Sequence, residues 1–183
     1  MSTNTEATIE DLYHVPDNQK AEIVNGEIVL MPPTGEKPNR AGFKICLRLY
    51  EHELKTGSGI AVADNAGFSV NLPHRKAFSP DAAFHTGQRT GMKFFEGAPV
   101  FAAEVRSEYD YGATAEREIR EKIADYFATG ALVVWDVDLL GEDVVRVYRR
   151  DAADNPTIYR RGDMAEAEPA VPGWSMAVDD LFQ

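Results

Sequence analysis

The chain has a single cysteine, Cys46, and this scarcity excludes a framework of intramolecular disulfides. A chain without disulfides suits a reducing compartment. The sequence also lacks an apolar run of the roughly 18 residues needed to cross a bilayer. Residues 1 to 6 are polar and acidic, unlike a secretory signal peptide. We therefore expect a cytoplasmic protein that does not enter a membrane.

Repeats, low-complexity tracts and linkers are also missing. With 183 residues, of which 44% are hydrophobic, the chain is long enough to build one domain around a full core. We expect that domain to span residues 1 to 183, with residues 1 to 7 flexible.

Positive charge is scarce, since 19 Lys and Arg stand against 30 Asp and Glu, for a net charge of −11. Neutralised phosphates supply most nonspecific DNA affinity, so this balance argues against a high-affinity nonspecific DNA binder. A nuclease is not excluded, because the local field matters more than net charge. Basic residues gather in three places, each of which can equally be an ordinary solvated surface. These are Lys37, Arg40, Lys44 and Arg48; Arg146, Arg149 and Arg150; and Arg160 and Arg161.

Several catalytic patterns are absent. The four histidines have no spacing typical of zinc ligands. There is no Gly-x-Ser-x-Gly motif, and Gly57-Ser58-Gly59 is too short for a phosphate-binding loop. Cys46 falls on the apolar face of a predicted helix, where packing is expected rather than nucleophilic chemistry. Asp136 and Asp138 share one strand face and could bind metal, but solvation of the strand end explains them as well.

What is present predicts an α/β fold. Asn25-Gly26, between strands at 20–24 and 27–31, is the strongest short-range signal for a hairpin. A short helix is predicted at 8–15 with Thr8 as its cap, and a long helix at 38–56. The apolar stripe expected on the long helix comprises Phe43, Cys46, Leu47, Tyr50 and Leu54.

A second long helix is predicted at 114–128, with Ile119, Ile123, Tyr126 and Phe127 as its apolar stripe. Further strands are predicted at 60–63, 67–71, 81–84, 100–106, 132–137, 144–149 and 157–160, with a closing helical turn at 178–182. This order predicts a mixed, mostly antiparallel sheet flanked by helices.

Two acidic residues in strand-like runs are the candidates for chemistry. Asp81 opens one run, where an ordinary turn residue is the alternative. Glu104 lies toward the end of another, where an unpaired charge would be costly and a structural ion pair is the alternative. Because neighbouring strands lie about 4.8 Å apart, the two carboxylates can share one hard cation. Lys122 borders the apolar stripe of its helix and can orient a water or offset charge on a phosphate. A surface ion pair with Glu118 is the alternative for this lysine.

Pro80-Asp81 followed by Glu104-Val105-Arg106 resembles the signature of PD-(D/E)XK nucleases, with Arg106 at the usual lysine position. Further segments resemble the Uma-type restriction-endonuclease-like family of this superfamily, in which the lysine comes from the following helix. These are Ala21 to Ile28, Glu104 to Ser107, Lys122 with Tyr126 and Gly130, Trp135 to Asp138, Val171 to Trp174, and Asp180 to Phe182.

The resemblance implies a restriction-endonuclease-like core and the activity of a metal-dependent phosphodiesterase, specifically a DNA endonuclease. Mg²⁺ or Mn²⁺ would be held by Asp81, Glu104 and the carbonyl of Val105, with Glu22 as an outer contact. Lys122 would be the catalytic lysine. Lysine is favoured over Arg106 because only its pKa can be lowered by burial.

Two supporting residues remain open to more than one interpretation. Arg106 would contact a phosphate or pair with acidic neighbours, and Tyr126 would orient Lys122 or simply pack in the core. Glu22 could equally be an exposed strand residue. Cleavage of two strands favours a homodimer. The alternatives are a binding module whose carboxylates Arg106 neutralises, and a hydrolase of small phosphoesters.

Overall fold

The structure is a computed structural model that describes residues 6–16 and 19–183. Of the N-terminal stretch expected to be flexible, residues 1 to 5 lie outside this range, whereas the Ala7 N–H donates to the Gly26 carbonyl at 2.9 Å. Among the described residues, no helix is long and apolar enough to cross a membrane.

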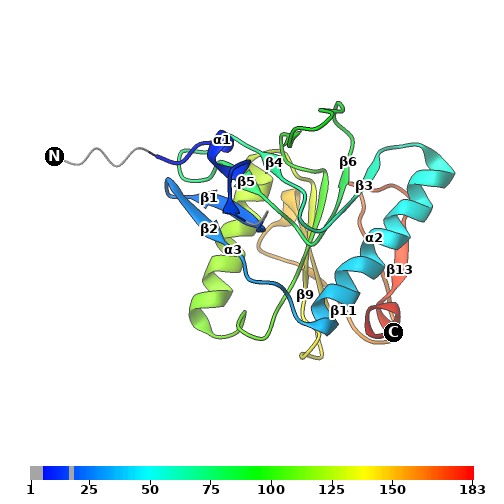
Figure 1. The fold of residues 1–183 in the computed structure, drawn as a ribbon. Coiled ribbons are helices and arrows are strands. Elements are labelled where there is room, and N and C mark those ends of the chain that lie inside the picture. The colour runs from blue at the N-terminus through cyan, green and yellow to red at the C-terminus, as the bar shows by residue number, and fades with distance from the viewer. Residues whose placement is uncertain (1–5, 17–18) are drawn as a thin grey trace.

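A six-stranded sheet with a helix against each face forms the centre of the molecule (Figure 1). The strand order is β11-β10-β9-β8-β6-β3, and only the β8–β9 pair is parallel. The strands are β3 Ile60–Ala63, β6 Ala82–His85, β8 Phe101–Val105, β9 Val133–Val137, β10 Val145–Arg149 and β11 Thr157–Tyr159. The predicted mixed, mostly antiparallel sheet flanked by helices is confirmed.

Shorter elements surround this sheet. Three small sheets pair β1 Ala21–Val24 with β2 Glu27–Leu30, β4 Phe68–Ser69 with β5 Ala77–Phe78 and β7 Phe95–Glu96, and β12 Met164–Glu166 with β13 Ser175–Ala177. The helices are α1 Ile9–Leu12, α2 Glu36–Thr56 and α3 Ala113–Ala128, with 3-10 turns η2 Arg150–Ala152 and η3 Val178–Phe182. Sequence periodicity misses β5, β7, β12 and β13, because strands of two or three residues are too short to show alternation.

Local signals place several element ends correctly. Thr8 caps α1 with a reciprocal bond to Asp11. Asn25 and Gly26 have positive φ angles of 53° and 77°, as a tight hairpin turn requires, and Gly57 ends α2 in the left-handed conformation. The predicted hairpin is therefore confirmed.

The apolar stripe predicted for α2 is wrong except at Cys46, which is partly buried against the core. Ala41, Ile45 and Leu49, spaced by four residues, face the sheet and are fully buried against β6 and β8. Phe43, Leu47, Tyr50 and Leu54 are instead exposed. The helix has two apolar rows, and the sheet accepts the row with the smaller side chains because Phe84, Phe101 and Trp135 already fill that layer.

This assignment predicts different costs for two substitutions on α2. Ile45→Ala should lower the free energy of unfolding by about 2–5 kcal/mol, because it opens a cavity in the core. Leu47→Ala, on the exposed row, should change it by less than about 0.5 kcal/mol. Urea unfolding of both variants measures the difference. A larger loss of unfolding free energy in Leu47→Ala than in Ile45→Ala would mean that the stripe predicted from the sequence is the buried one.

The second face of the sheet is covered by α3. Ile123 and Tyr126 are buried there against Ala83, Ala102 and Val134, as the stripe predicted for this helix requires. The β1–β2 hairpin lies beside α3 (Figure 1). The polar end of this face, where β6 begins and β8 ends, carries the candidate site.

Candidate active site

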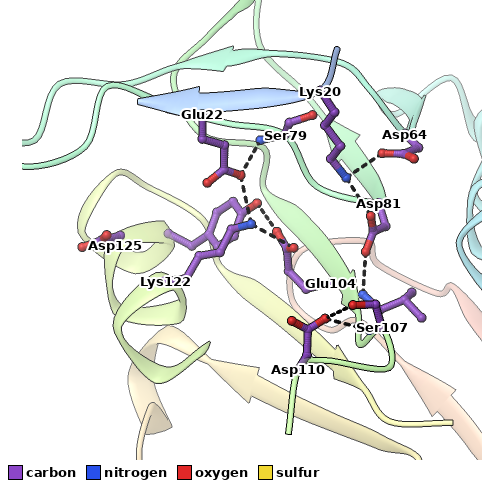
Figure 2. A network of polar contacts seen from close by, with 12 residues as sticks. Lys20, Glu22, Asp64, Ser79, Asp81, Glu104, Ser107, Asp110, Lys122 and Asp125 are labelled. Carbon is purple, nitrogen blue, oxygen red and sulfur yellow. Dashed lines mark hydrogen bonds and ion pairs between the residues drawn. The ribbon is translucent and has the colours of Figure 1, made fainter. Parts of the chain in front are cut away.

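Antiparallel pairing of β6 with β8 places Asp81 across from Glu104. Ala82 pairs with Ala103, and the backbone N–H of Asp81 donates to the Ala103 carbonyl at 3.1 Å. Extending that register by one residue makes Asp81 and Glu104 opposite neighbours, whose side chains share one face with Cβ atoms about 5 Å apart. Figure 2 shows both side chains within one network of polar contacts.

Both oxygens of Asp81 have partners. Oδ2 accepts the backbone N–H of Val105 at 2.7 Å, and Oδ1 accepts the ammonium of Lys20 at 2.8 Å. The same ammonium lies 2.7 Å from Asp64 (Figure 2). Burial disfavours the charged form of Lys20, but the negative charges of Asp81 and Glu104 outweigh it and raise the pKa of the amine. Lys20 is therefore a protonated member of the site.

Glu104 is held from α3. Its Oε2 accepts from Lys122 at 3.0 Å, and its Oε1 accepts from the Tyr126 hydroxyl at 2.6 Å. Burial raises the pKa of Glu104, the nearby charges of Asp81 and Glu22 raise it further, and Lys122 acts in the opposite direction. Any cation that binds this carboxylate therefore competes with a proton more effectively as pH rises.

Lys122 lies between two carboxylates rather than pairing with Glu118 on the surface. Its Nζ is 3.0 Å from Glu104 and 2.9 Å from Glu22. Burial alone would lower the pKa of Lys122, but the two carboxylates reverse that effect and raise it. The net pKa of Lys122 is therefore raised despite its burial, and the side chain offers a fixed positive charge rather than a base.

Glu22 is buried, which excludes the interpretation of it as an exposed strand residue. Besides Lys122, it accepts the Ser79 backbone N–H at 2.9 Å and the Arg75 guanidinium at 2.6 Å. Burial tends to raise the pKa of Glu22, but Lys122 and Arg75 outweigh it and lower the pKa. Arg75 in turn binds Asp125 of α3 at 2.7 Å. These contacts join the hairpin, the β5 segment and α3 behind the site.

Arg106 pairs with acidic neighbours, one of the two roles predicted for it. Its guanidinium makes two bonds of 2.7 Å to Asp136 and also binds Glu116 at the start of α3. Only 3% of the Arg106 side chain and 2% of the Asp136 side chain are exposed. The carboxylates of the candidate site are bound by lysines instead, Lys20 at Asp81 and Lys122 at Glu104.

Most of the basic residues grouped in the sequence are neutralised by carboxylates. Arg48 binds Asp180, Arg149 binds Glu166, Arg160 binds Asp143 and Arg161 binds Asp179. Arg146 lies 3.7 Å from both Asp136 and Asp138, which accounts for those two aspartates as ion-pair partners. At the start of α2, Lys37 and Arg40 are exposed to solvent.

Sequence reasoning missed Lys20, Asp64 and Arg75. Lys20 carried a usable signal, since it lies two residues before Glu22 in a predicted strand and so shares its face. Asp64 directly follows the strand predicted at 60–63, and Arg75 lies in a loop. Neither position shows a pattern that links it to Asp81 or Glu22, because only the fold brings these segments together.

Comparison with solved structures supports the fold. A crystal structure from Anabaena variabilis ATCC 29413, described as a putative nuclease belonging to DUF820, superposes with a TM-score of 0.74. The match covers 96% of this chain and 97% of the other, at 16% sequence identity. Among curated proteins, none gives a significant match.

One family model matches almost the whole chain. It is the Uma2 model, described as "Putative restriction endonuclease", and it covers residues 7–179. That range includes every residue of the polar network around Asp81, Glu104 and Lys122. The chain belongs to the Uma2 family of restriction-endonuclease-like proteins.

Proposed function

We propose that this chain is a metal-dependent phosphodiesterase that cleaves DNA as an endonuclease and works as a two-fold dimer. The observation that supports the activity most is the facing pair of Asp81 and Glu104, with the Lys122 ammonium 3.0 Å from the second carboxylate. The family description and the nuclease fold of the similar structure point to the same class of reaction.

The donor atoms fit Mg²⁺ or Mn²⁺. Within the described ranges, no three His, Cys, Asp or Glu side chains are arranged as a metal cage. Mg²⁺ does not require one, because it commonly takes one or two carboxylates and keeps several waters. A cationic group already lies against one of the two carboxylates, since the Lys20 ammonium binds Asp81. Asp81, Glu104 and the Val105 carbonyl would hold the metal, which would polarise a phosphate oxygen and lower the pKa of a bound water.

Lys122 would stabilise the negative charge that develops on the phosphate. Its ammonium is fixed between Glu104 and Glu22, and a charge held in place before the reaction costs no reorganisation during it. Glu22 would serve as the residue that positions Lys122, since both of its oxygens already have partners. Tyr126 would orient Glu104 through its 2.6 Å hydrogen bond.

A nucleic-acid strand would reach Asp81 through a pocket at the start of α2. A pocket of about 380 Å³ opens beside Asp81 and Asp64 and is lined on its other side by the start of α2, including Arg40 and Phe43. Arg40 would attract phosphates locally despite the acidic surface. Phe43, an exposed aromatic residue, offers a surface on which a base can stack.

The second candidate function is a non-catalytic binding module with the same fold. It is favoured by one observation, namely that both carboxylates already have a lysine partner. The two functions differ in whether a divalent cation binds at the site.

Asp81→Asn provides the test. The wild-type protein should bind Mn²⁺ and cleave DNA. The variant should bind Mn²⁺ at least about tenfold more weakly and lose most of its cleavage activity, because removal of a charged ligand costs about 1.4 kcal/mol or more of binding free energy. Calorimetry measures binding, and gel assays with duplex and single-stranded DNA and RNA measure cleavage. Asp154→Asn, at an exposed position, controls for net charge. Mn²⁺ binding and cleavage that are equal in both variants would refute the assignment.

A further inference from the structure

Lys20 has no role in the proposed reaction and belongs to none of the sequence motifs, yet its ammonium lies 2.8 Å from Asp81. It precedes β1 and is tied to the hairpin, because its carbonyl accepts the Met31 N–H at 2.9 Å. From there its ammonium reaches across to Asp81 and Asp64, and only 13% of its side chain is exposed (Figure 2). A buried ammonium is costly unless carboxylates compensate it, so these two contacts hold it in place.

The position of Lys20 conflicts with a divalent cation at Asp81. One oxygen of Asp81 is bound by the backbone N–H of Val105, which the sheet fixes. The other oxygen is bound by Lys20, whose side chain has four methylenes and can move. Because a dication and an ammonium repel each other strongly at contact distance, they cannot share this carboxylate favourably.

Asp64 offers a position to which the displaced ammonium can withdraw. It follows β3, its side chain is 38% exposed, and it already lies 2.7 Å from Lys20. Asp64 also lines the pocket beside Asp81 through which we propose that the DNA enters. A phosphate in that pocket would attract the ammonium away from Asp81.

We propose that Lys20 acts as a competing cation which holds Asp81 until a nucleic-acid phosphate draws it away, so that metal and DNA bind cooperatively. This inference rests on the proposed function, because it assumes that Asp81 is a metal ligand. Lys20 is then a positioning residue rather than a catalytic one. By linkage, DNA raises the affinity for metal and metal raises the affinity for DNA by the same factor.

The test is the affinity for Mn²⁺ alone, measured by calorimetry and by electron paramagnetic resonance. Lys20→Met should bind Mn²⁺ at least about tenfold more tightly than the wild type, because the competing charge is gone. Lys20→Gln, which keeps a hydrogen-bond donor without the charge, should behave in the same way and replaces the methionine variant if that one does not fold. Lys93→Met removes the same charge from an exposed position and should leave the affinity unchanged.

Two further measurements locate the effect. In an Asp81→Asn background the Lys20→Met gain should disappear, since Lys20 acts through Asp81. An uncleavable phosphorothioate DNA should tighten Mn²⁺ binding in the wild type and do so less in Lys20→Met. A purely structural ion pair would not produce either result.

The outcomes separate this inference from the proposed function. If Lys20→Met and Lys20→Gln bind Mn²⁺ no more tightly than a wild type that does bind it, Lys20 does not compete and only the inference is overturned. If the wild type binds Mn²⁺ neither alone nor with the phosphorothioate DNA but the Lys20 variants do, the competition is established and the metal-dependent activity of the wild type is overturned. If no variant binds Mn²⁺, both are overturned.

Discussion

Replacing Lys122 with alanine is expected to slow DNA cleavage by roughly 100- to 1,000-fold, the usual effect of losing one fixed group that stabilises charge in a transition state. Mn²⁺ binding should be retained, because an ammonium is not a metal ligand and its removal frees Glu104. Single-turnover cleavage with saturating Mn²⁺ measures the first effect, and calorimetry measures the second. The combination distinguishes a catalytic lysine from one that only supports the fold.

Arg117→Ala is the matched control for this variant. Arg117 lies on the same helix, its side chain is 63% exposed, and its nearest carboxylate partner is Glu121 at 3.8 Å. Cleavage by Arg117→Ala should stay within a few-fold of the wild type. If Lys122→Ala cleaves DNA as fast as the wild type, and Arg106→Ala folds but is inactive, the catalytic residue is Arg106 and not Lys122.

Arg106→Ala should lower the free energy of unfolding by about 3–5 kcal/mol, the usual cost of removing one partner from a buried ion pair. The reason is that Asp136, with 2% of its side chain exposed, would lose both of its 2.7 Å bonds to the guanidinium. Urea unfolding followed by circular dichroism measures the loss. Since Arg106 also joins the end of β8 to the start of α3 through Glu116, a looser α3 should reduce cleavage as a secondary effect.

Arg160→Ala is the corresponding surface control. Its ion pair with Asp143 is exposed, at 60% and 37% of the two side chains, so its removal should cost no more than about 1 kcal/mol. Equal losses in the two variants would mean that the Arg106 pair contributes no more than a surface contact. In that case a role for Arg106 in binding phosphate would become the better explanation.

Local sequence signals determined the elements that have long or strongly marked patterns. Four such features depend only on residues that are close together in the sequence. They are the Asn25-Gly26 turn, the Thr8 cap, Gly57 at the end of α2, and the apolar stripe of α3. Such features follow from backbone preferences and periodicity, which the sequence displays directly. The facing pair of Asp81 and Glu104 was also accessible, because two strands that pair bring their ends together.

The buried face of α2 could not be read in the same way. Its amphipathic pattern contains two apolar rows, and periodicity favoured the row with the larger side chains. Which row turns inward depends on the volume left by Phe84, Phe101 and Trp135 on the sheet. That volume is set by strands distant in sequence.

The sequence by itself determined the α/β class, the main helices and strands, and the three residue types around which a site could form. Only the tertiary structure decided the charge of that site. It brought Lys20 from the hairpin to Asp81, placed Lys122 between two carboxylates and so raised its pKa, and directed Arg106 to Asp136. The physical reason is that the state of an ionisable group depends on distances of a few ångströms to other charges and on burial. Both quantities arise between segments far apart along the chain.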